Sequence, residues 1–152
     1  MKKNIIYLLI FIFPITLLGY SYNPIERSLI QDFINSEYEY SGRVKIINPH
    51  FYKNYFKLFK NTFLIADSNS VFNSTDMITE KIPSKQIIFA GIQTHENTKG
   101  FIYYRKGGVV ISSYIIIYDF SKKRHPNFVI FSVENDIRDL NSMKEFVRSN
   151  FN

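Results

Sequence analysis

The first stretch with a helical pattern of apolar residues begins after Asn23. Its apolar positions recur every three to four residues: Ile25, Leu29, Ile30, Phe33 and Ile34. This spacing places them on one side of a helix. Asn23-Pro24-Ile25-Glu26 supplies a start signal, with Asn at the N-cap, Pro at the first helical position and Glu able to reach back to the cap. The pattern predicts a helix from Pro24 to about Tyr38, followed by a short extended piece from Arg43 to Ile47.

A second helical pattern follows Asn48-Pro49, which repeats the same start signal. Aromatic residues recur along it at helical spacing: Phe51, Tyr52, Tyr55, Phe56, Phe59 and Phe63. An aromatic row of this kind suits either a ligand-contacting surface or a core. The lysines near the opposite face favour an amphipathic helix whose aromatic side packs into the core. From Asp67 to Lys85 the chain turns polar and irregular, which predicts loops.

Four later runs are rich in Ile, Val, Phe and Tyr, the residues that favour strands. They are Gln86–Thr94, Phe101–Lys106, Val109–Phe120 and Asn127–Asn135. Short connections containing Gly, Asn, Ser or Pro separate them, which predicts an antiparallel meander. The third run alternates an aliphatic face with a face that carries tyrosines, so one side is expected under helices and the other partly in contact with water.

A last helix is predicted from Asp139 to Phe151, with Ser142 and Glu145 as a capping box. Its apolar side is made of Met143, Phe146, Val147 and Phe151. The whole pattern predicts an α+β domain, in which a four-stranded antiparallel meander is packed by two N-terminal helices and one C-terminal helix.

The N-terminus has the pattern of an export signal. Lys2 and Lys3 precede an uncharged apolar run from Ile5 to Leu18, and small residues flank Tyr20 in Gly19-Tyr20-Ser21. The alternatives are a core helix, which Pro14 would interrupt, and an uncleaved anchor, for which the run falls short of the ~20 residues that span a bilayer. We expect cleavage after Ser21, a single domain over residues 22–152, and a periplasmic or secreted location without a remaining transmembrane segment.

Composition narrows the choice of partners. The chain carries 19 Lys and Arg against 13 Asp and Glu. Loss of Lys2 and Lys3 leaves a net charge of +4, which is mild for a nucleic-acid-binding protein. Cysteine is absent, so thiol catalysis, Cys-ligated zinc and a lipidated N-terminal cysteine are excluded.

No motif for catalysis or cofactor binding stands out. His50, His95 and His125 each occur at a turn or helix start without a second ligand at metal-binding spacing. Gly107-Gly108 separates two predicted strands, so it cannot cradle a phosphate as a loop between a strand and a helix does. Three acids, Glu134, Asp136 and Asp139, resemble paired catalytic carboxylates but also suit a solvated loop before a helix. We expect no cofactor, no metal and no enzymatic activity.

Two candidate partner-binding surfaces remain. One is an exposed Tyr/Arg patch on neighbouring strands, with Tyr103, Arg105, Tyr114 and Tyr118, since Tyr and Arg often anchor interfaces. The other is the basic run Lys122, Lys123, Arg124 and His125 at a predicted hairpin tip, which suits an acidic partner or a weak contact with anionic lipid. The alternative interpretations are ordinary sheet packing for the tyrosines and a solvated turn for the basic run.

Two functions fit these features. The first is an exported protein-binding module that occludes a partner, as immunity proteins and enzyme inhibitors do. The second is a small-ligand binder, with or without weak enzymatic activity, whose curved sheet encloses an apolar pocket in the manner of cystatin-like or nuclear-transport-factor-like cones. A flat Tyr/Arg face would favour the first function, and an unfilled apolar pocket would favour the second.

Overall fold

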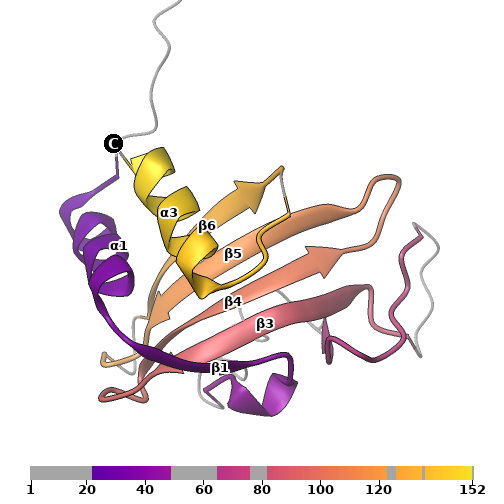
Figure 1. Cartoon of the computed structure of the whole chain (residues 1–152), viewed down its shortest axis with the longest axis horizontal. Helices are drawn as coiled ribbons and strands as arrows, with labels where there is room; N and C mark the ends of the chain where they lie inside the picture. Colours follow the sequence, from indigo (N-terminus) through magenta and orange to yellow (C-terminus); the bar gives the residue numbers. More distant parts are fainter. Residues whose placement is uncertain (1–21, 49–64, 76–81, 123–125, 135, 152) are drawn as a thin grey trace, which may run out of the picture.

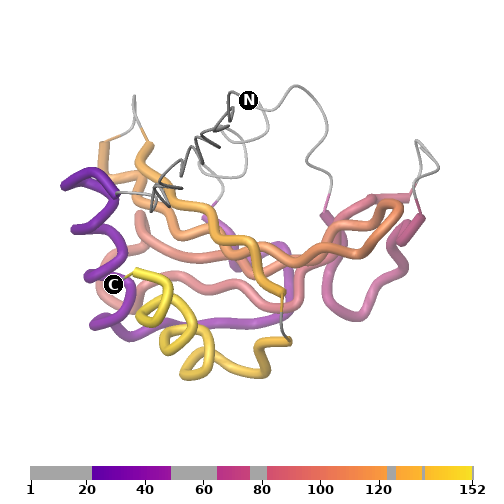
Figure 2. Tube along the Cα trace, turned by 90° about the horizontal axis from the view of Figure 1, so that it is seen from above, coloured from indigo at the N-terminus to yellow at the C-terminus, as the bar shows by residue number. Residues whose placement is uncertain are grey.

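The computed structural model describes residues 22–48, 65–75, 82–122, 126–134 and 136–151. The described elements, in chain order, are α1 (Pro24–Asn35), β1 (Tyr38–Ser41), the 3₁₀ helix η1 (Val44–Ile46), β2 (Ile65–Ala66), β3 (Lys85–Gln93), β4 (Lys99–Lys106), β5 (Ser112–Asp119), β6 (Asn127–Val133) and α3 (Leu140–Phe151). The strands form one sheet in the order β1-β3-β4-β5-β6, with the short β2 also pairing with β3. The helices α1 and α3 lie side by side on one face of this sheet (Figures 1 and 2).

The predicted α+β fold and its antiparallel meander are confirmed. The strands β3 to β6 pair consecutively and antiparallel. The strand count was too low, because β1 pairs antiparallel with β3 and β2 pairs parallel with it. The helix predicted over 51–63 lies outside the described residues.

Two local predictions near β1 were wrong. The first helix ends at Asn35 and not near Tyr38, because Tyr38–Ser41 pairs with Ala90–Gln93 of β3. The segment expected to be extended instead forms η1, whose first peptide N–H, on Val44, donates to the Asp67 carboxylate at 2.5 Å. Both departures depend on partners that are distant in the sequence.

The cap of α1 follows the predicted capping box. The side-chain oxygen of Asn23 accepts from the peptide N–H groups of Ile25 and Glu26, at 3.0 and 2.9 Å. The Glu26 carboxylate accepts in return from the Asn23 N–H at 2.9 Å. These bonds satisfy donors that the first helical turn leaves without intrahelical partners.

The cap of α3 lies one turn earlier than predicted. Asp139 precedes the helix, and its carboxylate accepts from the Ser142 N–H at 2.8 Å. The Ser142 hydroxyl lies 3.3 Å from the Asp139 N–H, so Ser142 occupies the third helical position and is not the cap itself. The hydrogen bonds from Ser142 lower the pKa of Asp139, which keeps the carboxylate charged at the helix N-terminus.

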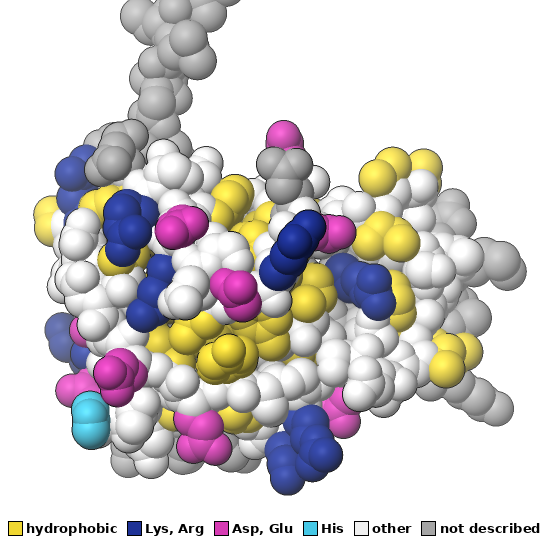
Figure 3. Space-filling view, in the orientation of Figure 1, with side chains coloured by type: hydrophobic (Ala, Val, Ile, Leu, Met, Phe, Trp, Pro, Cys, Tyr) yellow, Lys and Arg dark blue, Asp and Glu magenta, His cyan; other side chains and the backbone are white. Residues whose placement is uncertain are grey.

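The sheet buries side chains on both faces. Between the sheet and the helices lies a cluster that includes Phe33, Phe101, Tyr103 and Met143. On the opposite face, Ile102, Tyr104 and Tyr118 belong to a second buried cluster, which also contains Ile47 next to η1. The tyrosine-bearing face is therefore more buried than expected, because Tyr104 and Tyr118 are buried, although Tyr114 on the same face is half-buried. Hydrophobic side chains are visible between α3 and β1, and again at the end from which the β4–β5 loop projects (Figure 3).

Gly100 provides a test of how tightly β3, β4 and β5 pack. A Cβ atom at Gly100 would overlap the carbonyl oxygen of Gly91 and the hydroxyl of Tyr118, whereas at Gly108 the nearest atom is 3.6 Å away. We expect Gly100→Ala to lower the free energy of unfolding by about 1–3 kcal/mol, the usual cost of overpacking. The matched variant Gly108→Ala should change it by less than about 0.5 kcal/mol. Urea unfolding of the two variants measures this, and equal stabilities would contradict the tight packing.

Candidate functional site

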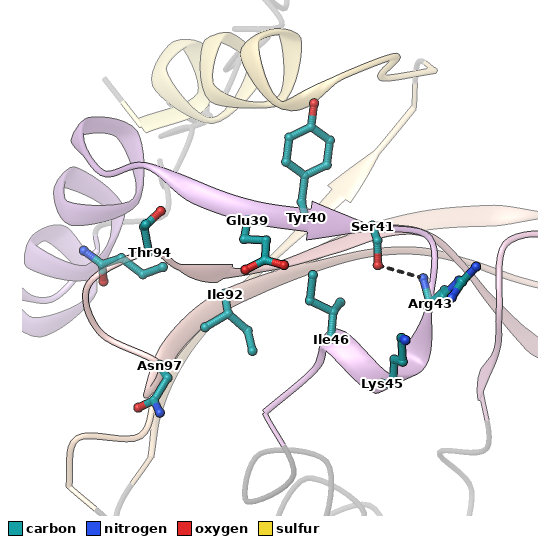
Figure 4. A pocket seen from close by; sticks show the side chains of 10 residues that line it. Glu39, Tyr40, Ser41, Arg43, Lys45, Ile46, Ile92, Thr94 and Asn97 are labelled. Carbon is teal, nitrogen blue, oxygen red and sulfur yellow. Dashed lines mark hydrogen bonds between the residues drawn. The ribbon is translucent and has the colours of Figure 1, made fainter.

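A cleft lies at the β1 edge of the sheet, where β1, η1 and the turn after β3 meet (Figure 4). Its volume is about 710 Å³. Ten residues line it: Glu39, Tyr40, Ser41, Arg43, Lys45, Ile46, Ile92, Gln93, Thr94 and Asn97. Charged side chains of both signs and two isoleucines therefore surround the same space.

Strand alternation determines which β1 side chains enter the cleft. The Glu39 side chain points toward Ile92 and Ile46, while the Tyr40 ring points away from them, toward α3 (Figure 4). The Tyr40 ring lies 5.8 Å from the ring of Phe89, yet 49% of the residue is exposed. Tyr40 is thus an accessible aromatic side chain beside the cleft.

The far wall of the cleft comes from the turn that leads into η1. The Arg43 N–H donates to the Ser41 hydroxyl oxygen at 3.3 Å, which holds this turn against the end of β1. Arg43 and Lys45 are both exposed. Two cations therefore line the same cleft as Glu39, so the site can receive a segment that carries polar or acidic groups.

The outer edge of β1 also has peptide groups directed away from the sheet. The Thr94 N–H donates to the Glu37 carbonyl at 3.0 Å. Because hydrogen-bonded and non-hydrogen-bonded pairs alternate along an antiparallel ladder, the N–H and C=O groups of Tyr38 and Tyr40 point away from β3. Among the described residues, β1 pairs only with β3. An added strand would find donors and acceptors here, next to the cleft.

The predicted Tyr/Arg patch is not an exposed surface. Tyr103 is fully buried under the helices, and its hydroxyl oxygen accepts from the Ile137 N–H at 3.3 Å. Tyr118 is fully buried on the opposite face, where its hydroxyl accepts from the Asn48 N–H at 3.4 Å. Tyr114 is half-buried and stacks on Tyr104 at a ring distance of 5.5 Å. The register pairs Tyr114 with Tyr104 and not with Tyr103, which places the predicted members on two different faces.

Arg105 is also engaged within the fold. Its guanidinium donates to the side-chain oxygen of Gln86, with the Nε–Oε1 distance at 2.8 Å, and lies 5.0 Å from the ring centre of Phe72. In the predicted basic run, Lys122 is exposed, whereas Lys123, Arg124 and His125 lie outside the described residues. Partner binding by the basic run stays a prediction.

Metal binding finds no support in the described part of the chain, which contains no group of three or more His, Asp or Glu side chains placed to hold a metal. His95 is exposed in the β3–β4 turn, while His50 and His125 lie outside the described residues. No described helix is both long and apolar enough to cross a membrane.

The sequence interpretation missed Glu39, Tyr40, Arg43 and Lys45 as site residues. Tyr38-Glu39-Tyr40-Ser41 does alternate large and polar residues, which is the signal of a half-buried strand. The segment is only four residues long and directly follows a strong helical pattern. Its first residue was therefore assigned to the end of the predicted helix, and no strand was predicted.

Comparison with protein-family models, curated proteins and solved structures finds no match for this chain. Function is therefore inferred from the geometry of the chain itself.

The buried hydroxyl of Tyr118 predicts a loss of stability at alkaline pH. Burial raises the pKa of Tyr118 to about 12, whereas a tyrosine in the unfolded chain ionises near pH 10. Stability from the neutral hydroxyl is fully present below pH 10 and is lost as the pH rises from 10 to 12, by up to about 2–3 kcal/mol. Urea unfolding across this range should show a smaller loss for Tyr118→Phe than for the wild type. An equal loss in both proteins would contradict the assignment.

Proposed function

We propose that this protein is a small exported protein-binding module, of the inhibitor or immunity type, that occludes a partner by pairing with it along β1. The observation that carries the proposal is the outward-directed edge of β1 beside the charged cleft. An extended segment of the partner would continue the sheet through main-chain hydrogen bonds, and its side chains would alternate into the cleft.

The side chains around this edge suit such a contact. Tyr40 offers a rigid, accessible ring, and Arg43 offers a planar cation that can bind a carboxylate through two hydrogen bonds. Tyr and Arg are enriched among the residues that contribute most to interfaces. Glu39 on the opposite wall disfavours an acidic group of the partner beside it. The cleft would therefore favour a partner segment whose acidic group lies near Arg43 and not near Glu39.

The alternative, a cone that encloses a small apolar ligand, finds less support. Aromatic rings fill the space between the sheet and α1: Phe33 lies 5.6 Å from Phe101, and Phe89 lies 5.3 Å from Tyr103. Such edge-to-face contacts belong to a packed core. The described cleft is instead open at the sheet edge and lined by charges, which suits a polypeptide better than an apolar small molecule.

Export is the part of the proposal that depends on the N-terminal sequence. If the signal is cleaved after Ser21, intact mass measurement of the exported protein should give a chain that begins at Tyr22. Tyr22 is the first described residue, and its ring lies 6.1 Å from Phe131 and 5.8 Å from Phe151. A mass that retains residues 1–21 would overturn the cleavage.

Two substitutions at one position test the strand pairing. Tyr40→Ala removes the exposed ring but keeps the outward N–H, whereas Tyr40→Pro removes both. Neither removes a hydrogen bond to β3, so the stability of the two variants should be similar.

A partner is first identified by affinity capture with the wild-type protein from the producer's exported fractions, followed by mass spectrometry and reconstitution as a stoichiometric complex. Its dissociation constant is then measured for each variant.

We expect Tyr40→Ala to weaken binding about tenfold and Tyr40→Pro to weaken it about fivefold further, the equivalent of one lost hydrogen bond. Equal affinities for the two variants would show that main-chain pairing along β1 does not contribute. Recovery of a copurified small molecule, with no stoichiometric protein, would overturn the module in favour of the ligand-binding cone.

A further inference from the structure

The loop between β4 and β5 exposes three consecutive aliphatic side chains. Residues 107–111 read Gly-Gly-Val-Val-Ile, and β5 begins only at Ser112, three residues later than the sequence pattern predicted. Val109 is 89% exposed, Val110 75% and Ile111 51%. A run of this kind has no role in the core, and contiguous exposed apolar groups commonly mark a contact with a membrane or a protein.

Two further aliphatic side chains belong to the same end of the molecule. The Gly107 N–H donates to the Ser84 carbonyl at 2.8 Å, and the Asn73 N–H donates to the Pro83 carbonyl at 2.8 Å. These bonds bring the segments that carry Val71, 79% exposed, and Ile82, 41% exposed, beside the loop. We call Val71, Ile82, Val109, Val110 and Ile111 the aliphatic end. In Figure 3, hydrophobic side chains are visible at this end of the molecule.

An exposed cation, Lys106, lies directly behind the aliphatic end. Lys106, the last residue of β4, is exposed and pairs across the ladder with Lys85. Burial, together with the charge of Lys106, lowers the pKa of Lys85. The described segments at this end, residues 71–75, 82–85 and 105–112, contain no Asp or Glu, while Asp76 and Glu80 lie outside the described residues. The exposed Lys106 ammonium group can therefore contact an anionic surface.

We propose that the aliphatic end inserts into the surface of an anionic phospholipid bilayer, with Val109, Val110 and Ile111 among the acyl chains and Lys106 at the phosphate groups. Apolar side chains at a protruding tip, with the exposed Lys106 just behind them, match the acyl chains and the phosphate layer of an anionic bilayer surface. A protein pocket is the less favoured occupant, because the tip has no aromatic residue and valine seldom contributes strongly to protein interfaces. This inference goes beyond the proposed pairing at β1 and does not depend on it.

The absence of tryptophan from the chain allows a direct test. Val110→Trp places a single indole at the tip, and Ser121→Trp places one at an exposed site in the opposite turn, next to Lys122. Each protein, purified from the exported fraction, is mixed with vesicles of phosphatidylglycerol and phosphatidylethanolamine, or of phosphatidylcholine alone. We expect a blue shift and quenching by brominated lipid for Val110→Trp with the anionic vesicles, and no change for Ser121→Trp.

Two more variants separate the apolar and charged contributions. The triple variant V109S/V110S/I111S should lower the partition coefficient on anionic vesicles at least about tenfold, and Lys106→Gln should lower it about fivefold at low salt. Both should melt at the wild-type temperature, because the altered side chains are exposed. All proteins share the same N-terminus, so any contribution from residues 1–21 cancels between them.

Three outcomes would overturn the inference. A shift of Ser121→Trp alone would assign lipid contact to the basic turn at the opposite end. Unchanged emission of both proteins on vesicles would exclude insertion. A shift of Val110→Trp only when a purified protein partner is added, and not with vesicles, would make the aliphatic end a protein contact.

Discussion

The central strands of the sheet bury side chains on both faces, and most other features depend on this double burial. Along β4, Phe101 and Tyr103 pack under the helices, while Ile102 and Tyr104 pack on the opposite side. Each face also ties down a distant segment through a buried hydroxyl, since Tyr103 binds the Ile137 N–H and Tyr118 binds the Asn48 N–H. An unpaired buried polar group costs stability, so these two bonds fix where the segments lie. The sheet thus holds both the chain before α3 and the chain after η1.

A sheet buried on both faces leaves its edges and ends for contact with other molecules. The β1 edge has outward-directed peptide groups, and the β4–β5 loop has side chains that no core receives. Both features would reduce solubility if they had no partner, because open edges and apolar tips favour association. We therefore propose both features as contact sites for other molecules. The predicted Tyr/Arg patch failed for the same reason: in a sheet buried on both faces, tyrosines of the central strands belong to the core.

The sequence correctly predicted those elements whose formation depends on neighbouring residues in the chain. The Asn23 cap and the four long strands are specified by neighbouring residues and were found. Of the apolar stripe predicted for α1, Ile25 is exposed and the other four residues are buried. β1 was missed because its partner lies about 50 residues away in the chain, so no local signal distinguishes it from the end of a helix. The alternation of side chains along β5 was predicted correctly, since Ile115 and Ile117 pack under the helices and Tyr118 packs on the opposite face. In β3, local alternation does not predict which face each side chain occupies. The register shifts between Ile87 and Phe89, and these residues, two apart, pack on opposite faces. A bulge of this kind breaks the parity on which sequence interpretation depends.

The positions of the two proposed contacts make them compatible. The cleft lies near the turn between β3 and β4, at Thr94 and Asn97, whereas the aliphatic end lies beyond the other end of β4. Tyr40 pairs with Gly91, which pairs with Phe101, and the five residue steps from Phe101 to Lys106 span about 17 Å at roughly 3.3 Å per residue. A bilayer that holds the aliphatic end would therefore leave Tyr40 and its part of the β1 edge in solution. Attachment would confine the module to the membrane surface, which raises its effective concentration for a partner that arrives at, or acts on, that surface.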